Sequence, residues 1–397
     1  MDPPCDFSEI RDSDVIAYAP MEFIKDGYYV PNYEKYGSLS GTLTRFQNGD
    51  IVMAKVTPCF ENGNIAIMKQ LKSAVGVGSS ELFVFRAKHV ITQFLFYCLR
   101  NPAFIKCACA TMTGVGGLKR VSPYFIRNAY CPFPSLSIQQ RIVKYLDQKC
   151  SFIESLISNH RLIIEKLKEY KQSLITEAVT KGLNPFIRTK DSGVEWIGPV
   201  PEHWSINRIG NLYINVSEPG NNELPILSVS INSGVSDKEL SEDESDRMFI
   251  RSEDRSKYKR VRPGDLTYNM MRAWQGAFGA VRVDGMVSPA YIVARPKAKG
   301  IDTRYIEALM RTPSATEEMH RYSHGIADFR LRLYWPEFKN IKICLPDLSE
   351  QQQIADYIDM KSAEIDSSIS IRESLITKLI EYKKSLIYEV VTGKKEV

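Results

Sequence analysis

A stretch of 14 residues, LSIQQRIVKYLDQK at residues 136–149, returns as LSEQQQIADYIDMK at residues 348–361. Its continuation also repeats, with EYKQSLITEAVT at residues 169–180 returning as EYKKSLIYEVVT at residues 381–392. Both pairs lie 212 positions apart, and about half of the aligned positions are identical without a gap. Self-similarity at one fixed offset is the signature of a duplicated architecture. The chain is therefore predicted to hold two copies of one plan.

Each copy of the repeat is predicted to form one long helix. It contains no Gly or Pro and is rich in Leu, Ile, Glu, Lys and Gln, which favour helix. Apolar residues recur at heptad-like spacing, so neither helix can bury its apolar stripe alone. We therefore expect the two helices to pack on each other as an antiparallel coiled coil. A polar residue interrupts each apolar seam at the same repeat position, His160 and Arg372, and such residues can fix the register.

Weaker echoes upstream of both helices extend the repeat to the rest of the chain. Gly49-Asp50 opens one apolar strand pattern, and Gly264-Asp265 opens its equivalent. We predict an α+β fold in which two pseudo-repeated domains of mixed α/β structure are joined by the two long helices. The predicted segments are a first domain at residues 1–135, a central helix at 136–183, a second domain at 184–347 and a C-terminal helix at 348–397.

Composition limits the classes of protein to which the chain can belong. Its 397 residues are 44% hydrophobic and 25% charged, with a formal charge of +5, which is typical of a folded globular protein. No apolar run approaches the roughly 18 residues of a membrane span, and the first residues lack the pattern of a signal peptide. The eight cysteines lack zinc-site spacing. We therefore expect reduced thiols, no metal site and a cytoplasmic location.

The sequence contains no motif for a reaction centre. Asp2-Pro3-Pro4-Cys5 is similar to the D-P-P-aromatic element of amino-group DNA methyltransferases, but Cys5 stands where an aromatic residue would stack on the flipped base. No phosphate-binding loop, nucleophile elbow, zinc-protease motif or paired-carboxylate pattern occurs. We therefore expect a binding protein without catalytic residues.

Polar and basic loops recur at equivalent places in both domains and favour nucleic-acid binding. One loop follows each Gly-Asp strand, and a glycine-containing basic segment precedes each long helix. Lys, Arg, Asn, Gln and Glu can contact base edges, and basic side chains neutralise phosphates. An ordinary exposed loop remains the alternative for any single residue. The candidate DNA-binding residues are Lys55, Thr57, Glu61, Asn62, Ser79, Ser80, Lys119, Arg120, Asn269, Arg272, Trp274, Gln275, Ser288, Tyr291, Arg330 and Arg332.

The order of these parts resembles the specificity subunit of type I restriction-modification systems, over nearly the whole chain. The resemblance lies in the L-S-x-Q-Q start of each long helix, DSGVEWIGPVPEHW at residues 191–204, FQNGDIVMAKVTPCFENGN at 46–64, GSSELFVF at 78–85 and MTGVGGLKRV at 112–121. It implies that each mixed domain is a target recognition domain reading one half of a bipartite, asymmetric site in double-stranded DNA. The two helices would set the length of the unread spacer.

The resemblance also implies partners and cofactors outside this chain. Two modification subunits would carry S-adenosylmethionine and methylate adenine, and restriction subunits would bring ATP and Mg. The chain itself would be a non-catalytic subunit that holds no cofactor. The first domain has no counterpart of residues 191–204, from which we expect a truncated or recombined gene or a start codon placed downstream. Two alternatives stay open: the recognition remnant of a fused restriction-methylation enzyme, and a coiled-coil adaptor without DNA binding.

Overall fold

The computed structural model describes residues 1–397 except 222, 232, 240–256 and 326–330. The backbone divides into two compact units. Unit 1 comprises Met1–Arg161 and Arg372–Val397, and unit 2 comprises Leu162–Ile371. Each unit therefore contains one mixed α/β domain together with half of each long helix. Within the described residues, no helix is both long enough and apolar enough to cross a membrane.

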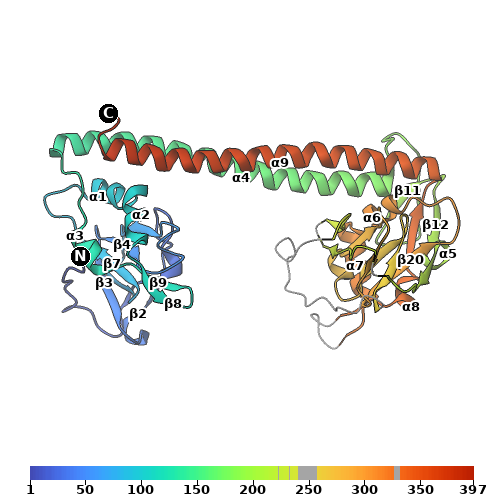
Figure 1. Ribbon diagram of the computed structural model, residues 1–397, viewed down its shortest axis with the longest axis horizontal. Helices are drawn as coiled ribbons and strands as arrows, with labels where there is room; N and C mark the ends of the chain where they lie inside the picture. The colour runs from blue at the N-terminus through green and yellow to red at the C-terminus, as the bar shows by residue number, and fades with distance from the viewer. Residues whose placement is uncertain (222, 232, 240–256, 326–330) are drawn as a thin grey trace. The chain divides into compact units, whose positions relative to one another are not determined.

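The two repeated stretches form α4 (Leu136–Lys181) and α9 (Leu348–Val391), which lie side by side (Figure 1). In unit 1, Lys383 of α9 places its Nζ 3.4 Å from Oε1 of Glu154 of α4. In unit 2, Lys171 of α4 places its Nζ 2.7 Å from Oδ2 of Asp366 of α9. The early part of each helix thus meets the late part of the other, which confirms the predicted antiparallel packing. The two ion pairs use the same two positions of the repeat.

The domain of unit 1 contains two sheets of three or more strands and a separate two-stranded hairpin. Its strands are β1 (Val15–Ala19), β2 (Tyr33–Lys35), β3 (Leu43–Gln47), β4 (Ile51–Ala54), β5 (Ile65–Ile67), β6 (Val75–Ser79) and β7 (Leu82–Phe85). One sheet has the order β2-β1-β6-β3, with β1 and β6 parallel, and the other has the antiparallel order β5-β4-β7. Both faces of β4 and β7 are buried, one against the first sheet and one in a core shared with α1 and the long helices. The continuous apolar runs of these strands follow from this two-sided burial.

Short helices and a hairpin connect the sheets of unit 1 to α4. They are α1 (Thr92–Leu99), α2 (Pro102–Cys109), the hairpin strands β8 (Thr113–Val115) and β9 (Leu118–Arg120), and α3 (Pro123–Asn128). Asn101 caps α2 by accepting a hydrogen bond from the backbone N–H of Ala103, and Pro102 occupies the first turn, where its missing N–H has no cost.

The domain of unit 2 is built around an antiparallel sheet of order β13-β20-β17-β18. Its strands are β10 (Thr189–Asp191), β11 (Pro199–Pro201), β12 (Ser205–Arg208), β13 (Tyr213–Val216), β14 (Val229–Ser230), β15 (Gly234–Val235), β16 (Lys259–Val261), β17 (Leu266–Asn269), β18 (Phe278–Ala280), β19 (Gly285–Val287), β20 (Tyr291–Pro296) and β21 (Lys342–Leu345). Its short helices are α5 (Ile209–Leu212), α6 (Thr303–Met310), α7 (Pro313–Arg321) and α8 (Trp335–Phe338).

The L-S-x-Q-Q motif attaches each domain to its long helix through one buried glutamine. In unit 1, Gln139 accepts a hydrogen bond from the backbone N–H of Ile91, the residue before α1, and donates one to the C=O of Pro134. In unit 2, Gln351 accepts from the N–H of Asp302, the residue before α6, and donates to the C=O of Pro346. Glutamine suits this position in both copies because its amide can pair with a buried backbone N–H and a buried backbone C=O at the same time.

A buried ion pair lies at the Gly-Asp position of both domains. Asp50 is buried at the start of β4 and receives two hydrogen bonds from Arg86, at 2.7 and 2.8 Å. Asp265 is buried at the start of β17 and receives two from Arg295, at 2.8 and 2.9 Å. Two parallel hydrogen bonds to a carboxylate are the strongest geometry available to arginine. Each pair therefore joins the start of the Gly-Asp strand to the neighbouring strand, β7 in unit 1 and β20 in unit 2.

Candidate nucleic-acid interface

The β8–β9 hairpin of unit 1 is anchored on the loop that follows β4. The backbone N–H of Thr57 donates to the C=O of Lys119, and that of Val121 donates to the C=O of Lys55. The Thr57 hydroxyl donates to the C=O of Gly117 at 2.7 Å and accepts from the N–H of Lys119 at 2.9 Å. The structure thus brings together four of the candidate residues predicted from the sequence, Lys55, Thr57, Lys119 and Arg120.

Ion pairing changes how much positive charge this surface offers. Arg120 lies against Glu81, with Nη2 2.8 Å from Oε1, and the hydrogen bonds from Arg120 hold the pKa of Glu81 below its usual value. Lys55 is half-buried over the ring of Phe83 and donates to the C=O of Ser80 at 2.9 Å, and burial lowers its pKa. Lys119 is exposed, and among the described contacts its side chain has no ion-pair partner. It is therefore the most available cation of the hairpin.

Ser79, the last residue of β6, and Ser80, in the turn before β7, lie next to this surface. The hydroxyl of Ser79 accepts a hydrogen bond from the N–H of Glu81 at 3.2 Å, and Ser80 is exposed. Glu81 was not among the predicted residues, although it directly follows them in the G-S-S-E motif. Its carboxylate fixes Arg120, so it belongs to the same surface.

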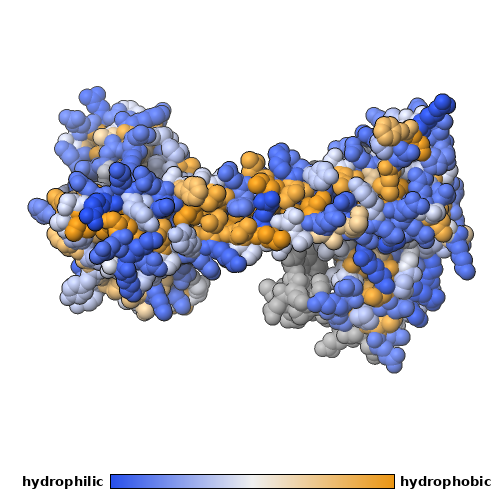
Figure 2. All heavy atoms as spheres, turned by 90° about the horizontal axis from the view of Figure 1, so that it is seen from above, coloured by the Kyte–Doolittle hydropathy of each residue, from blue (hydrophilic) through white to orange (hydrophobic). Residues whose placement is uncertain are grey.

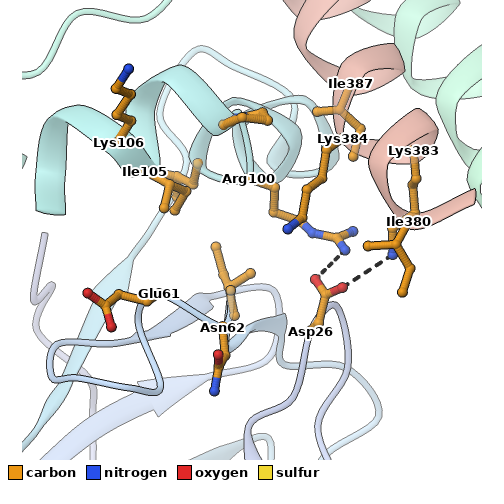
Figure 3. A pocket seen from close by; sticks show the side chains of 14 residues that line it. Asp26, Glu61, Asn62, Arg100, Ile105, Lys106, Ile380, Lys383, Lys384 and Ile387 are labelled. Carbon is orange, nitrogen blue, oxygen red and sulfur yellow. Dashed lines mark hydrogen bonds and ion pairs between the residues drawn. The ribbon is translucent and has the colours of Figure 1, made fainter. Parts of the chain in front are cut away.

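Glu61 and Asn62 lie elsewhere. They line a pocket of about 400 Å³ beside α2 and α9 (Figure 3). In this pocket Asp26 binds Arg100, with its Oδ1 2.5 Å from Nη2, and Lys383, with its Oδ2 3.2 Å from Nζ. These contacts attach the domain of unit 1 to α9. The structure therefore does not group Glu61 and Asn62 with the hairpin residues.

The tip of the hairpin exposes apolar side chains that the prediction did not include. Every residue of β8 and β9 is exposed, and Val115 has 92% of its surface accessible. Gly116 and Gly117 form the turn with positive φ angles, which glycine adopts without strain. A two-stranded ribbon of this kind is of a size that the major groove of DNA admits.

Unit 2 repeats the anchoring contact of unit 1. The N–H of Leu333 donates to the C=O of Met270 at 2.9 Å, joining the segment before α8 to the loop that follows β17. Leu333 and Met270 are the counterparts of Val121 and Lys55. His324 and Arg332 form a bridge of two backbone hydrogen bonds in the same segment, and the side chain of Arg332 is exposed. Arg330 lies outside the described residues.

The loop after β17 gathers further candidate residues. Asn269 is buried, and its Oδ1 accepts from the N–H of Met271, so its side chain shapes the loop and is not free to contact a base. Arg272 is exposed; burial raises the pKa of Tyr291 at the start of β20, and the nearby charge of Arg272 opposes this rise. The Nζ of Lys259, in β16, donates to the C=O of Tyr291 at 2.7 Å. Arg272, Tyr291 and Lys259 therefore lie together.

The remaining candidate residues of unit 2 have different surroundings. Ser288 accepts a hydrogen bond from the N–H of Ala290 and lies in the loop before β20. Trp274 packs edge-on against His320 of α7, with ring centroids 5.4 Å apart. Gln275 lines a groove of about 890 Å³ between the domain and the long helices. Trp274 and Gln275 therefore lie against helices.

These features define a class of protein with two domains of one plan, each fastened by a buried glutamine to the same pair of long helices and each exposing a basic loop surface. Residues 6–169 match the family described as "Type I restriction modification DNA specificity domain". This match covers most of the unit 1 domain and most of α4.

Similarity to individual proteins agrees with this family. The chain is 35% identical over 179 residues to the type I restriction enzyme EcoAI specificity subunit of Escherichia coli, covering 42% of this chain and 30% of that protein. It is 26% identical over 339 residues to the MjaVIII specificity subunit of Methanocaldococcus jannaschii, covering 80% and 74%. The alignment to EcoAI thus spans less than a third of that protein's length.

The fold is also similar to that of a solved chain. A structure described as "Structural basis underlying complex assembly and conformational transition of the type I R-M system" contains a chain that matches 96% of this one, over 92% of its own length. The TM-score is 0.71 at 15% sequence identity. At this identity the likeness concerns the fold alone. It agrees with the predicted fold of two mixed α/β domains joined by two long helices.

Proposed function

We propose that this chain is the DNA sequence-specificity subunit of a type I restriction-modification complex, and that each of its two domains reads one half of a bipartite, asymmetric DNA site. The observation that carries this proposal is the duplicated anchoring contact. In both domains a backbone hydrogen bond joins the loop after the Gly-Asp strand to the segment before the next helix, Val121 to Lys55 and Leu333 to Met270. Each contact brings basic side chains from two parts of the chain onto one surface.

The chemistry of these surfaces fits DNA better than a protein partner. In unit 1 the exposed Lys119 stands on a ribbon without acidic residues, and in unit 2 Arg272 and Arg332 are exposed on adjoining segments. Basic side chains supply the phosphate contacts that position a protein on DNA, while neighbouring polar groups reach base edges. Two surfaces with one backbone plan and different side chains support two different half-sites.

The long helices offer a duplicated surface for partner subunits. Figure 2 shows apolar residues gathered along the exposed side of α4 and α9. Exposed residues at equivalent repeat positions are Ile163 and Tyr170 in unit 2, and Leu375 and Tyr382 in unit 1. Tyrosine and apolar side chains are enriched at protein interfaces. We propose that two modification subunits bind here, one to each copy of the surface, and that restriction subunits join the complex.

In this proposal the chain carries out no chemical step. S-adenosylmethionine would be bound by the modification subunits, and ATP and Mg by the restriction subunits. The complex would act on DNA in the cytoplasm.

A direct test is the salt dependence of DNA binding by the purified chain. A protein that neutralises phosphates loses affinity linearly in a plot of log affinity against log salt concentration. We expect a negative slope of several units for a mixed-sequence duplex. A coiled-coil adaptor would show no salt-dependent binding, and that result would contradict the proposal.

A further inference from the structure

The tip of the unit 1 hairpin carries two apolar side chains that face each other across the strands. Val115, the last residue of β8, is paired with Leu118, the first residue of β9, and 92% and 47% of their surfaces are exposed. The two-residue turn Gly116-Gly117 joins them, and a Cβ atom at either glycine would meet no atom within 4 Å beyond the adjacent residues. The tip therefore exposes two apolar side chains beside open space.

The register of the hairpin divides its side chains between two faces. In an antiparallel pair, side chains of directly opposed residues lie on one face, and successive residues alternate between faces. Val115 and Leu118 therefore share one face with Arg120. Lys119 lies on the opposite face. The apolar pair and the most available cation of the hairpin thus occupy different faces of one ribbon.

The ribbon is held in place near its base and near its tip. Arg120 donates from Nε and Nη2 to the carboxylate of Glu81, at 2.9 and 2.8 Å. Nearer the tip, the hydroxyl of Thr57 donates to the C=O of Gly117 at 2.7 Å. Valine is also stiff about χ1. Because little conformational freedom is left to lose, Val115 can contact a partner at a low cost in entropy.

The surroundings of the apolar pair favour DNA over a protein partner. Residues 112–121 contain no acidic residue and include the two cations of the hairpin. Two side chains form a patch far smaller than the roughly 1,000 Å² that a stable protein interface buries. The strands of a ribbon lie roughly 4.8 Å apart, so a ribbon fits a major groove that is roughly 12 Å wide. Among the base edges in that groove, thymine alone offers an apolar group, its C5-methyl.

We propose that Val115 is a specificity-determining residue that contacts the C5-methyl group of a thymine in the half-site read by unit 1, with Leu118 beside it. This inference rests on the proposed function, because it requires that the unit 1 domain reads DNA. Cytosine lacks the methyl group, so the contact favours thymine over cytosine at one position. Lys119, on the other face, contacts phosphate whatever the sequence.

The first test maps adenine methylation directed by the full chain together with the proposed modification subunits. With Val115→Ala, one position of one half-site should lose about fourfold of its preference for thymine over cytosine, the effect of one methyl group taken out of water. The other half-site should keep its bases. Lys119→Ala should lower methylation without changing any base of the motif. Val15→Ala, the same change at an exposed valine outside the hairpin, should leave the motif unchanged.

A second test changes the DNA, so it does not depend on how a variant folds. Uracil, which lacks the C5-methyl group, replaces each thymine in turn in a duplex that carries the mapped motif. Fluorescence anisotropy then measures binding of the complex. One replacement should weaken binding about fourfold for the unchanged chain and less than twofold for Val115→Ala, because the methyl contact is already lost in that variant. Thermal unfolding of Val115→Ala checks that it folds.

Three results would overturn the inference. They are uracil tolerated at every position, a uracil effect that Val115→Ala leaves intact, and a Val115→Ala motif with the same base preferences as the original. If Val115→Ala also lost the modification subunits in gel filtration, the apolar pair would be a protein contact instead. Failure of the proposed function looks different: the unchanged chain would then direct no methylation motif, and the inference would fall with it.

Discussion

Arg372 of α9 places its Nη1 3.4 Å from Nδ1 of His160 of α4, and the two residues hold the same position of the repeat. In an antiparallel pair of repeated helices, only one position meets its own counterpart. The ion pairs Lys383–Glu154 and Lys171–Asp366 lie on either side of this position along the helices and are exchanged by the same 212-residue offset. The polar position predicted from the sequence therefore lies between the two equivalent ion pairs along the helices.

Replacing this polar pair by leucine is expected to stabilise the helices. The Nε of Arg372 is buried without a hydrogen-bond partner among the described atoms, and burying such a group costs about 1–3 kcal/mol. His160→Leu combined with Arg372→Leu should therefore raise the free energy of unfolding by about 1–3 kcal/mol, measured by urea unfolding and circular dichroism. The exposed neighbours Asn159 and Glu373, changed to leucine in the same way, should have little effect. A loss of stability in the first variant would show that the pair stabilises the native state.

The buried glutamine of each L-S-x-Q-Q motif is expected to be essential for stability, and the next glutamine is not. Gln139→Leu leaves the N–H of Ile91 and the C=O of Pro134 without partners, at a cost of about 1–3 kcal/mol for each buried group. Gln140→Leu, at an exposed position, is the matched control. The two variants are compared by urea unfolding, and equal stabilities would refute the anchoring role of Gln139.

The attachment of the unit 1 domain to α9 is expected to weaken in acid. Burial would raise the pKa of Asp26, but the charges of Arg100 and Lys383 outweigh it, so the pKa lies below 3.8. A carboxyl group with a lowered pKa contributes its full stability above the unfolded value of 3.8 and loses it as the pH falls through the folded value.

Asp26→Asn should therefore lower the free energy of unfolding by about 0.5–1 kcal/mol at pH 7, because Arg100 and Lys383 lose a charged acceptor that is half exposed and partly screened by solvent. The difference from the unchanged protein should shrink as the pH falls below 3.8. Urea unfolding from pH 7 to pH 3 measures this difference. If the difference in the free energy of unfolding between the two proteins stayed constant across that range, the charge of Asp26 would not contribute to stability.

Variants of Lys119 and Asn62 distinguish the interface that the structure indicates from the larger set of residues predicted from the sequence alone. Lys119→Ala should weaken binding to any DNA duplex and reduce the salt slope by about one, because one phosphate contact is lost. Asn62→Ala should leave affinity unchanged, since Asn62 lines the pocket beside α9. Fluorescence anisotropy over a range of salt concentrations distinguishes the two variants. If Asn62→Ala weakened DNA binding and Lys119→Ala did not, the hairpin would not be the interface.

The long helices could be predicted from the sequence because their information is local and repeated. The heptad pattern and the constant offset are sufficient to predict antiparallel packing and to identify His160 and Arg372 as register elements, whereas the contact between these two residues comes from the structure. The positions of Lys55, Thr57 and Lys119 were predicted as loops, but their grouping depends on hydrogen bonds between segments about 60 residues apart. No local pattern contains that information.

Other features of the site depend entirely on tertiary contacts. Glu61 and Asn62 have side chains suited to base recognition, yet the ion pairs of Asp26 with Arg100 and Lys383 hold their loop beside α9. Asn269 has the same chemistry, but its side chain is used to shape a turn. Residue type and spacing could predict which loops are polar, whereas the direction of each side chain could not be predicted.

Methylome mapping tests the specificity role most directly. The gene is expressed with the proposed modification subunits, and adenine methylation is mapped over a whole genome with and without this chain. We expect one bipartite, asymmetric methylation motif that disappears with the chain, and a weakening of that motif when Lys119 is changed to alanine. An unchanged methylome after removal of the chain, with the proposed modification subunits present, would contradict the specificity role.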